Sequence, residues 1–155
     1  MTYLSTALHC PHVPTQRLPK RPTSQMQMTA LFALYTLASL AHFSHNAEYI
    51  AFYPGLPAWM TRESVYLAWL AVVSVGLLAV AANWRGWKRI AAVLLFIYGM
   101  LGVDGLLHYT LALCSEHTLV TNITIWAEVL LGVFLACAAA IRLSRLAGSN
   151  GAAEA

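Results

Sequence analysis

The chain has 155 residues, of which 59% are hydrophobic and only 10% are charged, far below the roughly 25% charge typical of soluble domains. Its mean hydropathy is +0.64, and apolar runs near 20 residues recur along it, so the composition indicates an integral membrane protein. The formal net charge of +3 is small and the basic residues fall in separate clusters, which gives no support for nucleic-acid binding.

Both ends of the chain are expected to be disordered tails. Residues 1–25 combine four prolines with three basic residues and offer little to bury. Met26 and Met28 stand just before the first apolar run, so translation could start at Met1 or at either of them. Residues 148–155 begin with Gly-Ser-Asn-Gly. The segment between the tails, residues 26–147, is predicted to be one transmembrane domain.

The first two membrane helices are predicted over about residues 28–52 and 64–83. The first would be about 38 Å long at 1.5 Å per residue, so its outer end should project beyond a hydrocarbon layer of about 30 Å. It ends where Pro54 and Pro57 flank a glycine and break the helix. The second helix holds no ionisable side chain apart from the phenol of Tyr66, so we interpret it as a packing or lipid-facing helix.

Two more apolar runs predict helices over about residues 90–111 and 120–141. The expected fold class is therefore an all-α integral membrane protein, a four-transmembrane-helix bundle. Basic residues precede the first helix, join the second to the third and follow the fourth, whereas Arg62 alone lies on the opposite side. By the positive-inside rule, both termini are predicted to be cytoplasmic. The Ala/Leu/Arg-rich composition and the lack of eukaryotic targeting signals favour a bacterial cell inner membrane.

Counting along these helices places three ionisable groups at one depth. His42 follows residue 28 by 14 positions and Asp104 follows residue 90 by 14 positions, so each should lie about 21 Å from the cytoplasmic surface. Glu128 enters from the outer side and should lie about 12 Å below it, within roughly one turn of the other two. His45 and His108 are expected one turn further outward. The predicted cluster therefore faces the periplasmic side.

This cluster predicts a transition-metal site. Lipid cannot solvate imidazole or carboxylate groups, so they must find partners within the protein. Such groups are suited to zinc, copper, iron or manganese, and Glu128 would remain as a catalytic base or would orient a ligand. A metal there could activate water at the lipid headgroups or support oxidation of a lipophilic substrate. The expected metal ligands are His42, His45, Asp104, His108 and His117.

One short pattern resembles a known metal site. Asp104 and His108 are separated by three residues, and His117 follows them. This arrangement resembles the copper ligands in a membrane subunit of particulate methane monooxygenases, with a shorter second interval. The resemblance is confined to this stretch. It implies only that these three residues bind copper.

The lipid bilayer is the expected partner of this protein in every case. Three alternative functions remain open. His42 or His45 could join His108 as axial ligands of haem b, which would leave Asp104 and Glu128 without a role. A proton or cation relay would use the same groups, but the inner halves of the helices hold no acid or histidine to continue it. The buried groups could also hydrogen-bond the helices together in a structural subunit, assembled with other membrane proteins or as a homo-oligomer.

Overall fold

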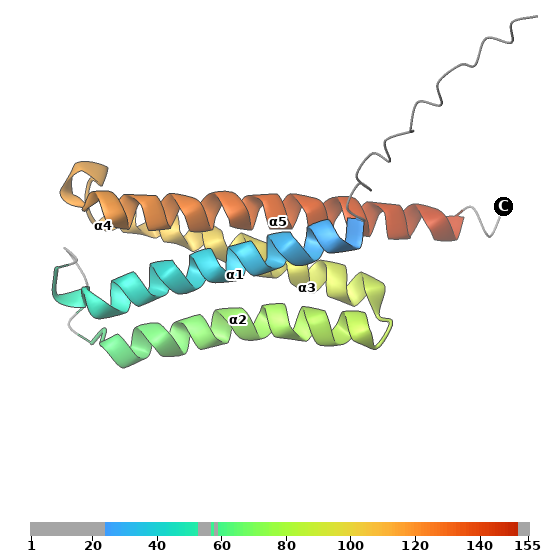
Figure 1. Cartoon of the computed structure of the whole chain (residues 1–155), viewed down its shortest axis with the longest axis horizontal. Helices are drawn as coiled ribbons and strands as arrows, with labels where there is room; N and C mark the ends of the chain where they lie inside the picture. The colour runs from blue at the N-terminus through green and yellow to red at the C-terminus, as the bar shows by residue number, and fades with distance from the viewer. Residues whose placement is uncertain (1–23, 53–56, 58, 152–155) are drawn as a thin grey trace, which may run out of the picture.

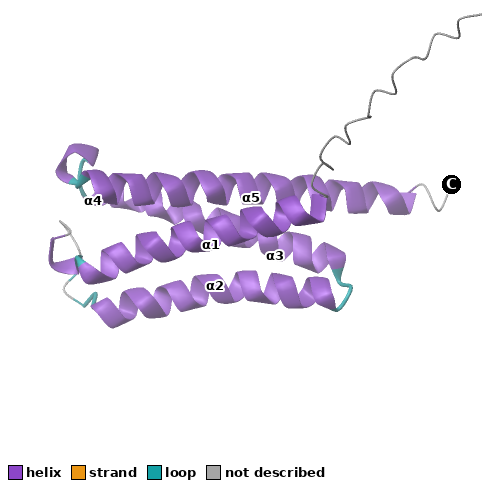
Figure 2. Cartoon of the chain, viewed as in Figure 1, coloured by secondary structure: helices purple, strands orange, loops and turns teal. Residues whose placement is uncertain are grey.

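The computed structural model describes residues 24–52, 57 and 59–151. Within these residues all regular structure is helical, and the long helices lie side by side in one bundle (Figure 1; Figure 2). The long helices are α1 (Ser24–Glu48), α2 (Arg62–Trp84), α3 (Lys88–Leu101) and α5 (Leu119–Gly151). The shorter turns are η1 (Ile50–Phe52), η2 (Gly102–Leu107), α4 (His108–Leu111) and η3 (Cys114–Glu116).

Four helical segments are long and apolar enough to cross a membrane, namely Ser24–Glu48, Arg62–Trp84, Lys88–Leu111 and Leu119–Gly148. Large apolar side chains also cover the outside of the bundle, an arrangement that marks a surface for lipid or for another protein. They include Leu34, Leu37, Leu67, Leu70, Leu77, Leu78 and Phe134. The all-helical architecture with four candidate membrane-spanning helices agrees with the all-α, four-helix part of the predicted fold class.

Local sequence explains where α2 begins and ends. The backbone N–H of Ser64 donates to Oγ1 of Thr61 at 3.2 Å, and the backbone N–H of Thr61 donates to Oγ of Ser64 at 2.9 Å. This reciprocal pair is a capping box, which satisfies two backbone donors at the start of the helix. The chain leaves α2 through Gly86, whose φ of 82° lies in the left-handed region that glycine adopts without strain.

The third candidate span is not a continuous α-helix, in contrast to the prediction for residues 90–111. After α3 the chain winds as a 3-10 helix through η2 before α4 adds one more turn. Gly102 and Gly105 lie in η2, and glycine has a low propensity for α-helix. A Cβ on Gly102 would come within 2.8 Å of the Tyr35 side chain. The departure from α-helix therefore coincides with glycines, one of which allows α1 to approach closely.

The helix ends also differ from those predicted. α5 continues past residue 141 to Gly151, and so enters the segment 148–155 that we expected to be disordered. Ala, Leu and Arg dominate residues 138–147, and these residue types propagate a helix well. α1 begins at Ser24, inside the predicted N-terminal tail. The rest of the two predicted tails, residues 1–23 and 152–155, lies outside the described residues.

Two buried tyrosines form the centre of the core. The rings of Tyr35 and Tyr98 pack edge to face with centroids 4.7 Å apart, and the Tyr35 hydroxyl donates to the carbonyl oxygen of Tyr98 at 2.9 Å. Both residues are fully buried. The other buried members of this cluster are Ala79, Leu95, Leu135 and Ala139. Tyr35 and Tyr98 therefore join α1 to α3, and residues of α2 and α5 pack against them.

We expect Tyr35→Phe to lower the free energy of unfolding by about 1 kcal/mol, because it removes one buried hydrogen bond and leaves the ring packing in place. Tyr66→Phe is the matched control. It also removes a hydroxyl, but one at the surface that donates to Glu48 at 2.8 Å, so its effect should stay below about 0.5 kcal/mol. Unfolding of the detergent-solubilised protein measures both changes, and equal effects would contradict the central place of Tyr35 in the core.

Candidate metal centre

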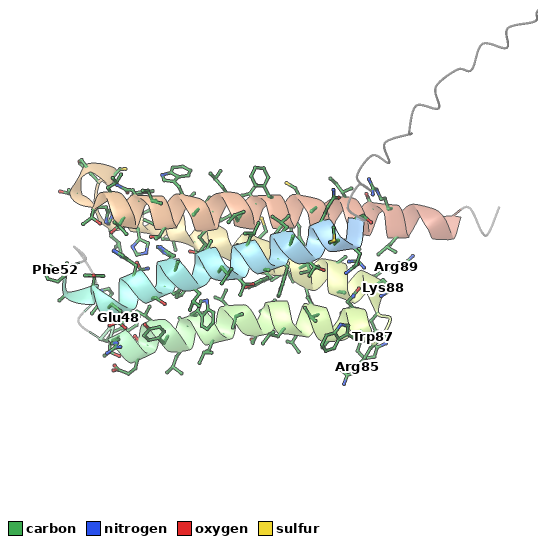
Figure 3. All side chains as sticks on the ribbon, in the orientation of Figure 1. Glu48, Phe52, Arg85, Trp87, Lys88 and Arg89 are labelled. Atoms are coloured by element: carbon green, nitrogen blue, oxygen red, sulfur yellow. The ribbon has the colours of Figure 1, made fainter. Side chains whose placement is uncertain are left out.

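Charged side chains divide between the two ends of the bundle. Glu48 and Phe52 lie at one end, and Arg85, Lys88 and Arg89 lie at the other (Figure 3). We call the first the acidic end, which also carries Glu63 and Glu116. We call the second the basic end, which consists of Arg85, Lys88, Arg89, Arg142 and Arg145. The candidate site lies in the half of the bundle nearer the acidic end.

His42 of α1 and Glu128 of α5 form a buried pair. Their side chains are only 2% and 1% exposed, and Nε2 of His42 lies 3.6 Å from Oε2 of Glu128. The depth count from the sequence places both residues within about one turn of one level, and the structure shows that they are also in contact. Gly105 of η2 packs against the same carboxylate, because a Cβ at this position would lie 3.6 Å from Oε2 of Glu128. The pair is therefore enclosed by α1, α5 and η2.

Asn46 bridges two histidines. Its Nδ2 lies 3.1 Å from Nε2 of His42 and 3.1 Å from Nε2 of His108. An amide nitrogen only donates, so both Nε2 atoms accept, and each neutral ring carries its proton on Nδ1. Nδ1 of His42 lies 3.4 Å from Oγ1 of Thr124, which donates its own hydrogen to the carbonyl oxygen of Thr121 at 2.9 Å. Thr124 is thus placed to accept from His42 and to orient its ring.

Several buried polar atoms of this site make no hydrogen bond. Among the residues that the structure describes, they are both carboxylate oxygens of Glu128, Oδ1 of Asn46 and the hydroxyl of Ser39. Most buried polar atoms in proteins are paired, because an unpaired one costs about 1–3 kcal/mol. Three of these four atoms can only accept hydrogen bonds. The Ser39 hydroxyl next to Glu128 can supply one donor, and the remaining acceptor oxygens are open to a cation.

A cavity of about 390 Å³ opens beside the cluster, between α1, α2 and the segment from η2 to α4. The polar part of its wall is formed by His42, Asn46, Ser64, Asp104 and His108. The apolar part is formed by Phe43, Ile50, Trp59, Met60, Val65, Ala68, Leu107 and Leu111. The cavity thus combines a surface suited to a hydrocarbon with a small polar region.

The structure corrects the expectation that His108 lies one α-helical turn outward from Asp104. The chain between them winds as a 3-10 helix, with about 3.0 residues per turn, so residues four apart are offset by roughly 120°. His108 is half-buried, whereas Asp104 is exposed. Both still line the same cavity, but only His108 reaches the Asn46 amide in the contacts described above.

His45 and His117 line a second cavity of about 480 Å³ at the acidic end, together with Tyr49, Phe52 and Glu116. The ring of His45 packs against that of Tyr49, with centroids 4.8 Å apart. The ring centroid of His117 lies 6.1 Å from that of His108, and its Nε2 lies 3.4 Å from the backbone carbonyl oxygen of His108. His117 therefore links the two cavities, and His45 belongs to the second.

The predicted site residues consequently do not all gather at one point. In the described ranges, no three His, Cys, Asp or Glu side chains are placed to bind a metal ion together. The Asn46 amide lies between His42 and His108, whose ring centroids are 5.2 Å apart. The site in this conformation is a bridged pair of histidines next to a buried carboxylate.

Asn46, Thr124 and Ser39 are residues of the site that the sequence prediction missed. Asn46 follows His42 by four positions and Ser39 precedes it by three, so both lie on the helical face that carries His42. Thr124 precedes Glu128 by four positions. The spacing of three or four residues that places His45 near His42 also places Asn46 and Ser39 there. The prediction considered only ionisable side chains, so these uncharged polar residues were left out.

Comparison with models of protein families, with curated proteins and with solved structures finds no match to this chain. The chemistry of the site is therefore the basis for assigning a function.

Proposed function

We propose that this chain is a small multi-pass membrane protein that binds one transition-metal ion between His42, His108 and Glu128. The observation that carries the proposal is the convergence of acceptors. Nε2 of His42 and Nε2 of His108 both face one amide nitrogen, and beside them lies a buried carboxylate whose two oxygens make no hydrogen bond within the described residues. A metal ion satisfies all of these acceptors at once.

The distances in the site support this ligand set. Bonds of about 2.0–2.2 Å to nitrogen and oxygen in a tetrahedral zinc site put neighbouring ligand atoms roughly 3.4 Å apart. Nε2 of His42 and Oε2 of Glu128 are 3.6 Å apart, so they need little movement. The Asn46 amide has to turn away, and its Oδ1 is then available as a further ligand. Imidazole and carboxylate ligands suit zinc, copper, iron and manganese alike.

The adjoining cavity supports a reaction on a lipophilic molecule. Its apolar wall accommodates a hydrocarbon, and Asp104 and His108 lie where the polar end of such a molecule would meet the ion. The ion would activate water or support oxidation. With the basic end in the cytoplasm, as the positive-inside rule requires, the site lies in the periplasmic half of a bacterial inner membrane.

A structural role is the second candidate. It is favoured by the Asn46 bridge, which joins α1 to α4 without any ion. Haem b between His42 and His108 is less well supported, because the two rings pack edge to face with centroids 5.2 Å apart. Axial ligands need the flat macrocycle between them, so this pair would have to separate widely.

The metal content of the detergent-purified protein, measured by mass spectrometry, tests the proposal. We expect about one equivalent of metal in the wild-type protein. His108→Ala should lower the metal affinity more than about tenfold, since losing a ligand should cost at least as much affinity as losing an outer-shell partner. This variant should therefore lose most of its metal on purification. His45→Ala is the matched control, because it removes the same residue type from the second cavity, and it should retain the ion.

Two results would overturn the assignment. An equal loss of metal in His45→Ala and His108→Ala would contradict the ligand set. A wild-type protein that binds none of zinc, copper, iron(II) or manganese when these are added would leave the structural role as the better explanation.

A further inference from the structure

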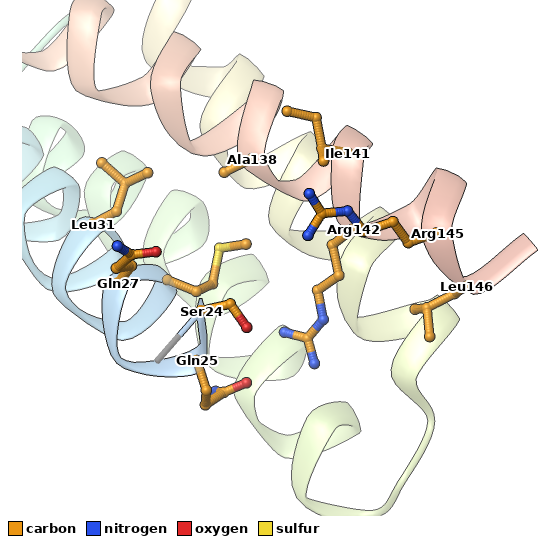
Figure 4. Close-up of a pocket in the computed structure, with 10 residues that line it drawn as sticks. Ser24, Gln25, Gln27, Leu31, Ala138, Ile141, Arg142, Arg145 and Leu146 are labelled. Atoms are coloured by element: carbon orange, nitrogen blue, oxygen red, sulfur yellow. The ribbon is translucent and has the colours of Figure 1, made fainter. Parts of the chain in front are cut away.

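A separate cavity lies at the basic end, far along the bundle from the histidines. It has a volume of about 390 Å³ and opens between the first turns of α1 and the last turns of α5 (Figure 4). Arg142, Arg145 and Gln25 form a polar rim, and Met28, Leu31 and Ile141 form an apolar wall. Figure 4 shows both arginine side chains on the side of α5 that faces Ser24 and Gln25.

No acidic side chain neutralises the basic end within the described residues. Their acidic residues are Glu48, Glu63, Asp104, Glu116 and Glu128, and all belong to the other half of the bundle. The ion pair found in the described residues, Arg62 with Glu48, and the buried pair of His42 and Glu128 lie there too. Within the described residues, the five cations of the basic end therefore produce a positive field that no carboxylate there compensates.

Neutral oxygens hold some of these cations in place. Arg142 donates to Oδ1 of Asn83 at 2.9 Å, and Lys88 donates to the carbonyl oxygen of Asn83 at 3.0 Å. Arg89 donates to the carbonyl oxygen of Leu146 at 3.3 Å. Such bonds position the positive groups without cancelling their charge, so an anion at this end would be met by preorganised partners.

We propose that this cavity binds the headgroup phosphate of an anionic phospholipid. A guanidinium group matches the oxygens of phosphate in a planar, bidentate geometry. Basic pockets between membrane helices on the cytoplasmic side are suited to anionic headgroups. The apolar wall favours a lipid over free phosphate, because Met28, Leu31 and Ile141 lie within candidate membrane spans, where an acyl chain would run alongside them.

Arg145 offers the cleanest test. In the described part of the chain its guanidinium makes no hydrogen bond or ion pair with the protein, so its removal should leave the fold intact. Arg85→Gln is the matched control, because it removes the same charge from the basic end at a residue outside the cavity, where Arg85 lies over the ring of Trp87 with 5.9 Å between its Cζ and the ring centroid.

The experiment is native mass spectrometry of the full chain in detergent with added phosphatidylglycerol or phosphatidylcholine. We expect the wild-type protein to retain phosphatidylglycerol preferentially. Arg145→Gln should weaken this binding about fivefold, which corresponds to about 1 kcal/mol, because it removes a charge-assisted contact to the phosphate. Arg85→Gln should change it less than about twofold, and the unchanged melting temperatures of both variants should show that the fold is kept.

Three outcomes would overturn the proposal. Equal weakening by the two substitutions would indicate general attraction to a basic surface. Equal retention of the two lipids would show that the headgroup charge is not recognised. Displacement of phosphatidylglycerol by inorganic phosphate at equal concentration would identify a site for the free anion in place of a lipid site.

Discussion

Glu128→Leu is expected to stabilise the metal-free protein while weakening metal binding. The carboxylate is 1% exposed and its oxygens make no hydrogen bond in the described residues, so folding buries it at a cost that an apolar side chain of similar size does not incur. We expect the free energy of unfolding to rise by about 1–3 kcal/mol and the metal affinity to fall more than about tenfold. Opposite changes in stability and binding are typical of residues kept for function.

Glu63→Leu is the matched control for this substitution. Glu63 is an exposed acid in the first turn of α2, and its replacement should leave the metal content unchanged and alter stability by less than about 1 kcal/mol. Thermal unfolding after treatment with a chelator, combined with the metal content before it, measures both properties. A Glu128→Leu protein that is less stable than the wild-type protein would identify the carboxylate as a structural link between helices.

Gly99→Val is expected to produce the largest loss of stability. A Cβ at residue 99 would lie 2.5 Å from the carbonyl oxygen of Gly132 and 2.8 Å from the backbone nitrogen of Ala136. Both atoms belong to the backbone of α5, so they can yield only if α3 and α5 separate. A clash with two backbone atoms should cost about 3 kcal/mol, the upper end of the usual range for overpacking, and at about 2–4 °C per kcal/mol the melting temperature should fall by roughly 6–12 °C.

Gly148→Val provides the comparison on α5 itself, because a Cβ at residue 148 would meet no other atom within 4 Å. Its melting temperature should stay within about 2 °C of the wild-type value, since exposed substitutions rarely matter. A Gly99→Val protein that melts at the wild-type temperature would contradict the close packing of α3 against α5 at Gly99 and Gly132.

Hydropathy alone is enough to predict most of this architecture. α2 was expected over residues 64–83 and is observed over Arg62–Trp84, because a long apolar run between a capping threonine and a turn leaves few alternatives. The prediction was weaker where glycine controls the backbone. Gly102 and Gly105 allow the 3-10 winding of η2, and no hydropathy pattern distinguishes this from a continuous α-helix.

The sequence predicts at which level along the bundle each site residue lies, but not towards which neighbouring helix its side chain points. Counting residues along a helix gives the level of a side chain, and His42 and Glu128, which the count places near one level, lie in contact. The same count does not tell how each helix is rotated about its axis. His45 therefore lies at the second cavity. The position between His42 and His108 is occupied by Asn46, an uncharged residue that was not among the predicted ligands.

X-ray absorption at the edge of the bound metal tests the proposed ligand set most directly. For the wild-type protein loaded with one equivalent of zinc, we expect two imidazole nitrogens and a carboxylate oxygen at about 2.0–2.2 Å. The imidazole contribution should fall by about half in His108→Ala loaded with excess zinc and stay unchanged in His45→Ala. A shell of oxygen atoms alone, or a spectrum that only His45→Ala alters, would contradict a metal ion held between His42, His108 and Glu128.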